Sequence, residues 1–274
     1  MSKSAALVAN ARMYAVAPGA TAAWNRLFAW LQQTSGVSLT VIDHAFPAPL
    51  SDLWRRDDLA CTFMCGWPFL RLGAQHRVVA APVPAADYGA GQPVYCSHFI
   101  VKATSPFETL KDAFGHRFAY TIEDSHSGYN APRHCLMRYR EQPGQKLFGE
   151  VVGPLTTPRR VLEAIVEGRA DVGPQDSFAF DLMCRHLPEL ASQVRIIASS
   201  DTMPIPAFMA SAGTSADIVE RLRAALLSIK DSPELAPVCA DLCITGFATL
   251  APEAYELSEA WAQDAERRGL ATIT

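Results

Sequence analysis

The sequence has no long run of apolar residues. The short apolar stretch after Lys3 is interrupted at Asn10 and Arg12, which makes it too short for the apolar region of a secretory signal. No run of about twenty apolar residues occurs anywhere, so we expect no membrane insertion. We therefore expect a cytoplasmic protein, or a periplasmic one if an upstream signal was trimmed from this N-terminus.

Dense clusters of Lys and Arg are also missing. The formal net charge is -4 over 274 residues, which argues against a nucleic-acid partner or an anionic membrane surface. The hydrophobic content of 49% is enough for a large core and for two lobes of ordinary domain size. We expect a monomer that binds a small molecule.

The cysteine pattern excludes two kinds of site. The seven cysteines are odd in number and are not arranged as a disulfide framework. Cys61 and Cys65, like Cys239 and Cys243, are separated by three residues, whereas zinc knuckles have two residues between their cysteines. We predict no metal and no cofactor, with the cysteines acting as small buried hydrophobic residues.

The first part of the chain alternates between strand and helix patterns. Strands are predicted at 5–16, 37–43 and 59–65, and helices at 21–31 and 50–56. A helix is also predicted at 105–115, because Ser105 is a candidate cap, Pro106 follows it, and Gly115 ends the segment. The βαβαβ order predicts an α/β protein with a parallel sheet.

Two extended crossings, near 97–101 and 205–209, divide this pattern. A middle block lies between them, and the two ends of the chain form an outer block. We predict a two-lobed clamp in which lobe 1 contains residues 1–96 and 206–274, and lobe 2 contains residues 97–205. Two hinge crossings would connect the lobes.

A small polar turn stands at the centre of the middle block. Residues 121–132 read Thr-Ile-Glu-Asp-Ser-His-Ser-Gly-Tyr-Asn-Ala-Pro, between a short apolar run and a helical segment. Such a turn directs backbone N–H groups, serine hydroxyls and a helix N-terminus at one point, which suits a phosphate-like or carboxylate anion. The alternative is that Asp124 or Ser125 simply caps the helix and Gly128 eases the turn.

Several motifs together resemble one family. Residues 95–102 read Tyr-Cys-Ser-x-Phe-Ile-Val-Lys, residues 105–119 read Ser-Pro-x-x-x-Leu-x-Asp-x-x-Gly-x-Arg-x-Ala, residues 124–132 read Asp-Ser-His-Ser-Gly-Tyr-x-Ala-Pro, and residues 168–176 read Gly-x-Ala-Asp-Val-Gly-x-x-Asp. This combination resembles the phosphate, phosphite and phosphonate solute-binding family of ABC transporters. Residues 13–14 and 65–69 resemble a branch of that family without a signal.

The resemblance implies a type 2 periplasmic-binding-protein fold and a phosphonate-like or phosphate-ester-like ligand. It also implies an ABC transporter permease as a partner, although the missing signal argues against delivery to a transporter. The residues implied in ligand binding are Ser125, His126, Ser127 and Gly128 of the turn, Tyr95 and Ser97 of the first crossing, Asp176, Trp67 and Tyr14. Asp176 would meet a ligand amine or hydroxyl. The alternatives are that Asp176 caps a helix, and that Trp67 and Tyr14 are core aromatics.

Two other functions use different residues or contexts. An enzyme on the same fold would use Cys65 as a nucleophile with His98 or His126 as a base. An effector-sensing module would use the same clamp, but no DNA-binding helix pair precedes it. We predict a binding protein with no catalytic residues.

Overall fold

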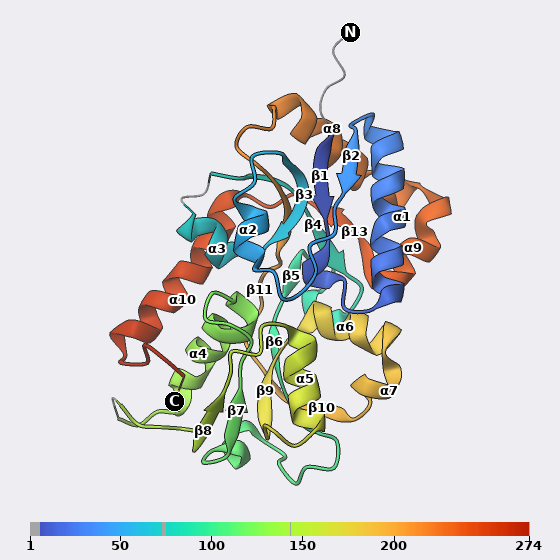
Figure 1. Ribbon diagram of the computed structural model, residues 1–274. Helices are drawn as coiled ribbons and strands as arrows, with labels where there is room; N and C mark the ends of the chain where they lie inside the picture. Colours follow the sequence, from blue (N-terminus) through green and yellow to red (C-terminus); the bar gives the residue numbers. More distant parts are fainter. Residues whose placement is uncertain (1–5, 73–74, 143, 274) are drawn as a thin grey trace. The chain divides into compact units, whose positions relative to one another are not determined.

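The protein is described by a computed structural model that covers residues 6–72, 75–142 and 144–273. The chain divides into two compact units, each with its own sheet (Figure 1). Unit 1 consists of Met1–Val94 and Pro204–Ala254, and unit 2 of Tyr95–Met203 and Tyr255–Thr274. In the described part of the chain, no helix is both long enough and apolar enough to cross a membrane.

Unit 1 contains a six-stranded sheet in the order β13-β4-β12-β3-β1-β2. Strand β1 pairs in parallel with β2 and β3, which is the predicted βαβαβ arrangement. Strand β12 lies between β3 and β4 and is antiparallel to both. The elements are β1 (Leu7–Asn10), α1 (Pro18–Ser35), β2 (Leu39–Val41), α2 (Leu50–Trp54), β3 (Leu59–Met64), α3 (Gly66–Arg71), β4 (Arg77–Pro84), β12 (Ala207–Ala210), α8 (Ala216–Leu227), α9 (Ala236–Asp241) and β13 (Ile244–Ala248).

The core of unit 1 is aromatic. The rings of Phe63 on β3 and Phe208 on β12 are stacked with centroids 4.1 Å apart. Trp24 of α1 meets Phe63 edge-on at 5.1 Å, and its indole N–H donates to the Tyr14 carbonyl. Aromatic pairs of this kind add to the stabilisation from burial. Helix α1 is therefore fixed to the sheet through its buried face, which includes Trp24.

Unit 2 contains a five-stranded sheet in the order β10-β6-β9-β7-β8. Strand β7 is parallel to β8 and β9, so these three strands end at the same edge, and β6, antiparallel to β9, begins there. The elements are β6 (Ser97–Lys102), β7 (Arg117–Ala119), a π-helical turn (His126–Asn130), α4 (Ala131–Leu136), β8 (Glu150–Val152), α5 (Pro158–Val166), β9 (Val172–Asp176), α6 (Ser177–His186), α7 (Pro188–Ala191), β10 (Val194–Ser199) and α10 (Glu256–Arg267).

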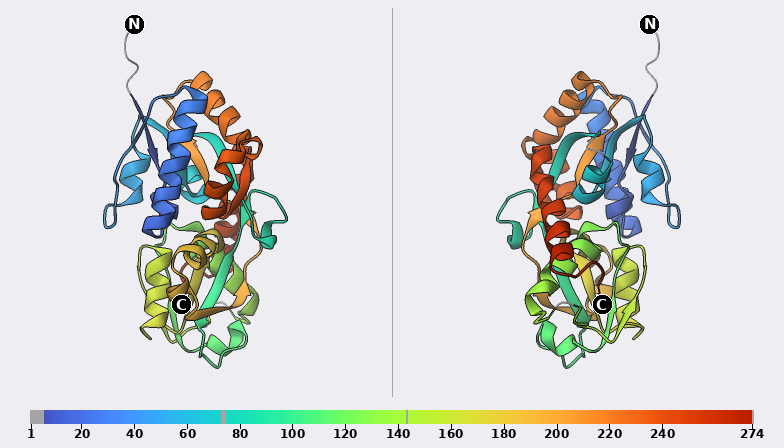
Figure 2. Two further views of the ribbon diagram at one scale, coloured as in Figure 1. Left: turned by 90° about the vertical axis from the view of Figure 1, so that its right-hand side faces the viewer. Right: turned by 90° about the vertical axis from the view of Figure 1, so that its left-hand side faces the viewer.

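The last part of the described chain belongs to unit 2. We call residues 255–273 the C-terminal arm. The prediction placed them in lobe 1, which is wrong, because α10 packs against α4 of unit 2. Trp261 of α10 is buried and its ring stacks on His134 of α4, with centroids 4.8 Å apart and an interplanar angle of 2°. The arm lies beside α4 in both views of Figure 2.

The chain passes between the two units at three points, at 94/95, 203/204 and 254/255. At the first two points it runs through short strands, β5 (Val94–Tyr95) and β11 (Met203–Pro204), which pair with each other as a two-stranded sheet. The crossings predicted near 97–101 and 205–209 correspond to β6 in unit 2 and β12 in unit 1, which begin just after these two passages. The third passage leads into the C-terminal arm and was not predicted.

The helix predicted at 105–115 is wrong. The segment contains only a short 3-10 turn, Leu110–Ala113, which starts after Thr109. Asp112 Oδ2 accepts from the Thr109 backbone N–H at 2.7 Å and from its hydroxyl at 3.0 Å. This capping box starts the turn at Thr109 rather than at Ser105.

The cysteines differ in their exposure, which predicts their order of alkylation. Cys61, Cys96 and Cys135 are buried, whereas Cys184 on α6 is exposed. Burial raises the pKa of the Cys96 thiol to about 11, so it is neither accessible nor ionised at neutral pH. We expect iodoacetamide to modify Cys184 first, and Cys61, Cys96 and Cys135 only with urea present, as measured by peptide mass mapping. Equal rates at all four cysteines would contradict this.

Candidate functional site

The polar turn after β7 is closed by hydrogen bonds among its own residues. The Ser125 hydroxyl accepts from the Gly128 backbone N–H at 2.9 Å, and the Asn130 N–H donates to the Ser125 carbonyl at 3.1 Å. The resulting i to i+5 pattern is a π-helical turn, a feature often found at functional sites. A Cβ atom at Gly128 would overlap the Thr121 side chain, so the turn requires glycine at this position. Ser125 therefore does act as a cap, as the alternative interpretation of this motif proposed.

Three predicted site residues form a hydrogen-bonded chain in unit 2. The Ser97 hydroxyl donates to the Ser127 carbonyl at 2.7 Å, and the Ser127 hydroxyl donates to Asp176 Oδ2 at 3.1 Å. Asp176 Oδ1 accepts from the Ala179 N–H at 2.9 Å and so caps α6. All three residues are buried. The pairing of the strands brings these residues together, because Ser97 begins β6 directly opposite Asp176 at the end of β9.

His126 turns its ring toward the C-terminal arm. The ring is buried, its Nδ1 lies 3.0 Å from Asn130 Nδ2, and its centroid is 5.6 Å from that of Trp261. Burial, together with the nearby His134, lowers the pKa of His126 to about 3. The imidazole is therefore neutral at physiological pH. Because the ring faces Trp261, the backbone N–H is the group of His126 that could bind an anion at the turn.

The three predicted aromatic residues are all buried. Tyr95 lies in the connecting strand β5 and is 0% exposed. Tyr14 and Trp67 belong to unit 1, where the Tyr14 ring meets Phe63 edge-on at 4.9 Å and the Arg71 guanidinium lies 5.3 Å from the Trp67 ring centroid. These contacts agree with the alternative that Tyr14 and Trp67 are core aromatics. Contact of these aromatics with a ligand stays a prediction.

The loop of residues 153–157, which no sequence motif marks as part of the site, lies beside the turn. The Thr156 N–H donates to the Thr121 carbonyl at 2.7 Å, and the Leu155 N–H donates to the Tyr120 carbonyl at 3.1 Å. Thr156 has a φ of 72°, a left-handed conformation that is unusual for threonine. Thr157 caps α5, its hydroxyl accepting from the Arg160 N–H. Thr157 and Pro158 are a recognisable helix start in the sequence. Where this helix start lies relative to the turn depends, however, on the pairing of β7 with β8.

The residues of the enzyme alternative are poorly suited to catalysis. Cys65 is buried and directly precedes α3 of unit 1. Burial lowers the pKa of His98 to about 4, which makes its imidazole a weak base, as at His126. Among the described residues, no three His, Cys, Asp or Glu side chains are grouped to hold a metal ion.

Comparison with solved structures identifies the fold. A binding-protein component of an ABC phosphonate transporter from Pseudomonas aeruginosa has a TM-score of 0.80 and 18% identity, over 97% of this chain and 89% of that chain. The PhnD1 protein of Prochlorococcus marinus, solved with methylphosphonate, has a TM-score of 0.78 and 14% identity, over 96% and 98%. The alkanesulfonate-binding protein SsuA of Xanthomonas axonopodis pv. citri, bound to MOPS, has a TM-score of 0.63 and 15% identity, over 100% and 97%.

Comparison with family models identifies the relationship. No curated protein sequence matches the chain. The model described as "ABC transporter, phosphonate, periplasmic substrate-binding protein" matches residues 17–255. Members of this family are substrate-binding components that serve a permease, and they are not enzymes. The chain therefore belongs to the phosphonate periplasmic substrate-binding protein family of ABC transporters.

Proposed function

We propose that this protein binds a small phosphonate, or a related phosphate ester, at the turn Ser125–Gly128 of unit 2. The observation that carries the proposal is the chain from Ser97 through Ser127 to Asp176, at the edge where three parallel strands end. Anionic ligands of α/β proteins bind outside the carboxyl ends of strands, near helix N-termini. Thr156, whose N–H donates to the Thr121 carbonyl, and Thr157, which caps α5, add two hydroxyl groups next to the turn.

The proposed donors are all uncharged. They are the Thr157 hydroxyl, backbone N–H groups of the turn and the Ser127 hydroxyl once it turns from Asp176 to the ligand, whereas the Ser97 hydroxyl stays bonded to the Ser127 carbonyl. The ionisable residue in this hydrogen-bonded chain is Asp176. A carboxylate beside a bound anion repels it, unless the ligand supplies a hydrogen-bond donor between the two. We therefore propose that the ligand offers an amine, a hydroxyl or an acidic P–OH proton to Asp176.

Calorimetry with three ligands tests the proposed ligand class. We expect aminomethylphosphonate to bind more tightly than methylphosphonate, and methanesulfonate to bind least, because it has neither an amine nor an acidic proton at neutral pH. Ser127→Ala removes a hydroxyl partner of a charged group, so we expect it to weaken phosphonate binding by about 1.5–3 kcal/mol.

The matched control is Ser192→Ala. The Ser192 hydroxyl donates to the Glu189 carbonyl at an exposed position, so its removal should leave the affinity unchanged. If wild-type protein bound none of the three ligands, the proposed function would be wrong. If phosphonate bound equally well to Ser127→Ala and wild type, the site would be wrong although the function stood.

The compartment and the oligomeric state remain predictions. Proteins of this family are normally periplasmic, whereas the sequence predicts a monomer that is cytoplasmic, or periplasmic if a signal was trimmed, with an ABC transporter permease as an implied partner. We propose that the cytoplasmic form binds the same ligand. Cell fractionation followed by sedimentation of the native protein tests both predictions, since a periplasmic protein would contradict the cytoplasmic form and a stable dimer would contradict the monomer.

A further inference from the structure

Asn130 connects the polar turn to the C-terminal arm. Its side chain is fully buried and has three partners. Nδ2 donates to the Ser258 carbonyl at 2.8 Å and lies 3.0 Å from His126 Nδ1, while Oδ1 accepts from Arg133 at 3.1 Å. Its two amide hydrogens and its carbonyl oxygen are thus all used, which fixes the orientation of the side chain. One amide therefore contacts the turn, α4 and the arm.

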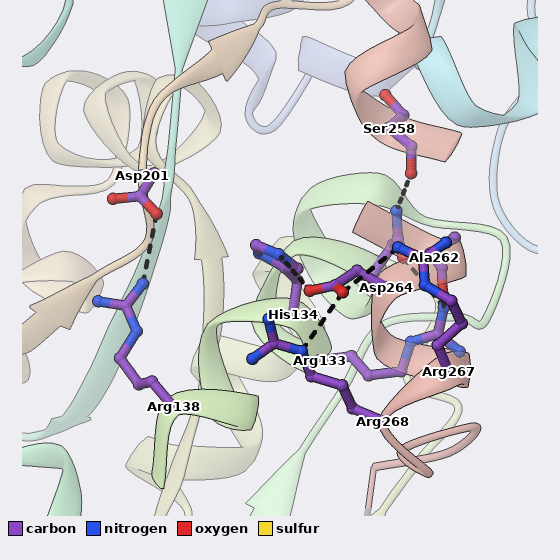
Figure 3. A network of polar contacts seen from close by, with 10 residues as sticks. Arg133, His134, Arg138, Asp201, Ser258, Ala262, Asp264, Arg267 and Arg268 are labelled. Atoms are coloured by element: carbon purple, nitrogen blue, oxygen red, sulfur yellow. Dashed lines mark hydrogen bonds and ion pairs between the residues drawn. The ribbon is translucent and has the colours of Figure 1, made fainter. Parts of the chain in front are cut away.

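Arg133 strengthens the same connection. Its Nη1 donates to the Ala271 carbonyl at 2.6 Å, and its Nη2 is 3.5 Å from the Ala262 carbonyl. Figure 3 shows Arg133 beside α10, with the Ser258 and Ala262 carbonyls facing the same cluster. The guanidinium is buried, and a fixed fork of donors of this kind can hold several acceptors in a defined geometry. Arg133 therefore binds both the helix of the arm and the chain beyond it.

Further contacts from the arm reach the turn itself. Trp261 of the arm lies against His126 of the turn and stacks on His134. The Asn130 backbone N–H also closes the turn by donating to the Ser125 carbonyl. A displacement of Asn130 would therefore move Ser125 and, with it, the Gly128 N–H that the Ser125 hydroxyl holds.

We propose that Asn130 and Arg133, held by the C-terminal arm, are positioning residues for the anion-binding turn. The effect on affinity rests on the proposed function, but the effect on the turn does not. In this proposal, residues that follow the family match by position, beyond 255, take part in binding without touching the ligand. A site held to within a fraction of an ångström requires such support from its neighbours.

The test compares two contacts that the same arm makes. Asn130→Ala removes the link between turn and arm, and Arg133→Met is the second variant in case the first fails to fold. The matched control is Arg140→Met, because Arg140 Nη1 also binds the arm, at the Gly269 carbonyl over 2.9 Å, but at an exposed site away from the turn. All proteins are checked by circular dichroism at a temperature where they are folded.

Two readouts separate positioning from simple stability. In ligand-free protein, we expect the Gly128 amide to exchange its hydrogen at least about tenfold faster in Asn130→Ala than in wild type or Arg140→Met. With methylphosphonate and aminomethylphosphonate, we expect the Kd to rise about tenfold in Asn130→Ala and to stay within about twofold in the control. A variant that was only less stable would keep its Kd while folded.

Each outcome decides a different question. Unchanged Gly128 exchange in both Asn130→Ala and Arg133→Met would overturn the positioning role, whatever the ligand. Faster exchange with an unchanged Kd for a phosphonate that wild type binds would also overturn it, since the turn would then not be the binding element. Faster exchange in a protein whose wild type binds neither phosphonate would leave the positioning role supported and the proposed function wrong.

Discussion

Acidification from pH 7.5 to pH 4.5 is expected to lower the free energy of unfolding by about 5 kcal/mol through two buried histidines. Burial lowers the pKa of His126 to about 3 and that of His98 to about 4, from an ordinary value of 6.5. Below pH 6.5 the unfolded chain therefore takes up a proton at each histidine, whereas the folded protein does not. The resulting loss is about 1.4 kcal/mol per pH unit for each histidine.

The sign follows from the lowered pKa values. The stability contributed by neutral histidines is fully present above the unfolded pKa of about 6.5 and decreases as the pH falls toward the folded values. Urea unfolding at a series of pH values measures this slope. His98→Gln combined with His126→Gln removes both titrating groups and should flatten the slope, while His116→Gln at an exposed position serves as the control. An unchanged slope in the double variant would contradict the prediction.

Gly128→Ala is expected to destabilise the protein by about 3 kcal/mol and to abolish phosphonate binding. The added Cβ would overlap the Thr121 side chain, and the turn would have to open at the Ser125 to Gly128 hydrogen bond. Thermal unfolding and calorimetry measure the two effects. Gly213→Ala is the matched control, since its Cβ would be at an ordinary distance of 3.5 Å from the Asp57 carbonyl.

A second-site variant tests the cause of this loss. Thr121→Gly removes all three atoms that the new Cβ would meet. In combination with Gly128→Ala, it should give a destabilisation clearly smaller than the sum of the two single variants, because the residues are in direct contact. Strict additivity would show that the steric conflict between residues 121 and 128 is not the reason.

Local patterns in the sequence were sufficient to predict the α/β fold. Alternating strand and helix patterns before residue 65 gave the parallel pairing of β1 with β2 and β3. The prediction of a helix starting at Ser105 is wrong because Ser105 and Thr109, four residues apart, are both possible caps. The reciprocal bonds between Thr109 and Asp112 fix the start at Thr109, and only a short turn follows. The position of the arm was also missed, because its attachment to Asn130 and Arg133 depends on contacts more than a hundred residues apart in the chain.

The candidate site was predictable as a motif but not as a geometry. Ser125, Ser127 and Gly128 stood out because small polar residues followed a strand. The contact between Ser97 and Ser127 depends on the antiparallel pairing of β6 with β9, which no local pattern specifies. The sequence does not show whether Asp176 is a helix cap or a ligand partner, because both roles place a carboxylate at the start of a helix. The loop with Thr156 was missed for the same nonlocal reason.

The insertion of β12 between β3 and β4 bears on how the protein is made. During translation, the ribosome releases β3 and β4 long before residues 207–210, so the sheet of unit 1 keeps an open gap while all of β6 to β10 is synthesised. Unit 2 in turn lacks its C-terminal arm until unit 1 has been released to residue 254. Nascent chains would expose unpaired strand edges for most of synthesis. We therefore expect the sheet of unit 2 to form during translation, before the sheet of unit 1, which can be completed only after residues 207–210 have left the ribosome.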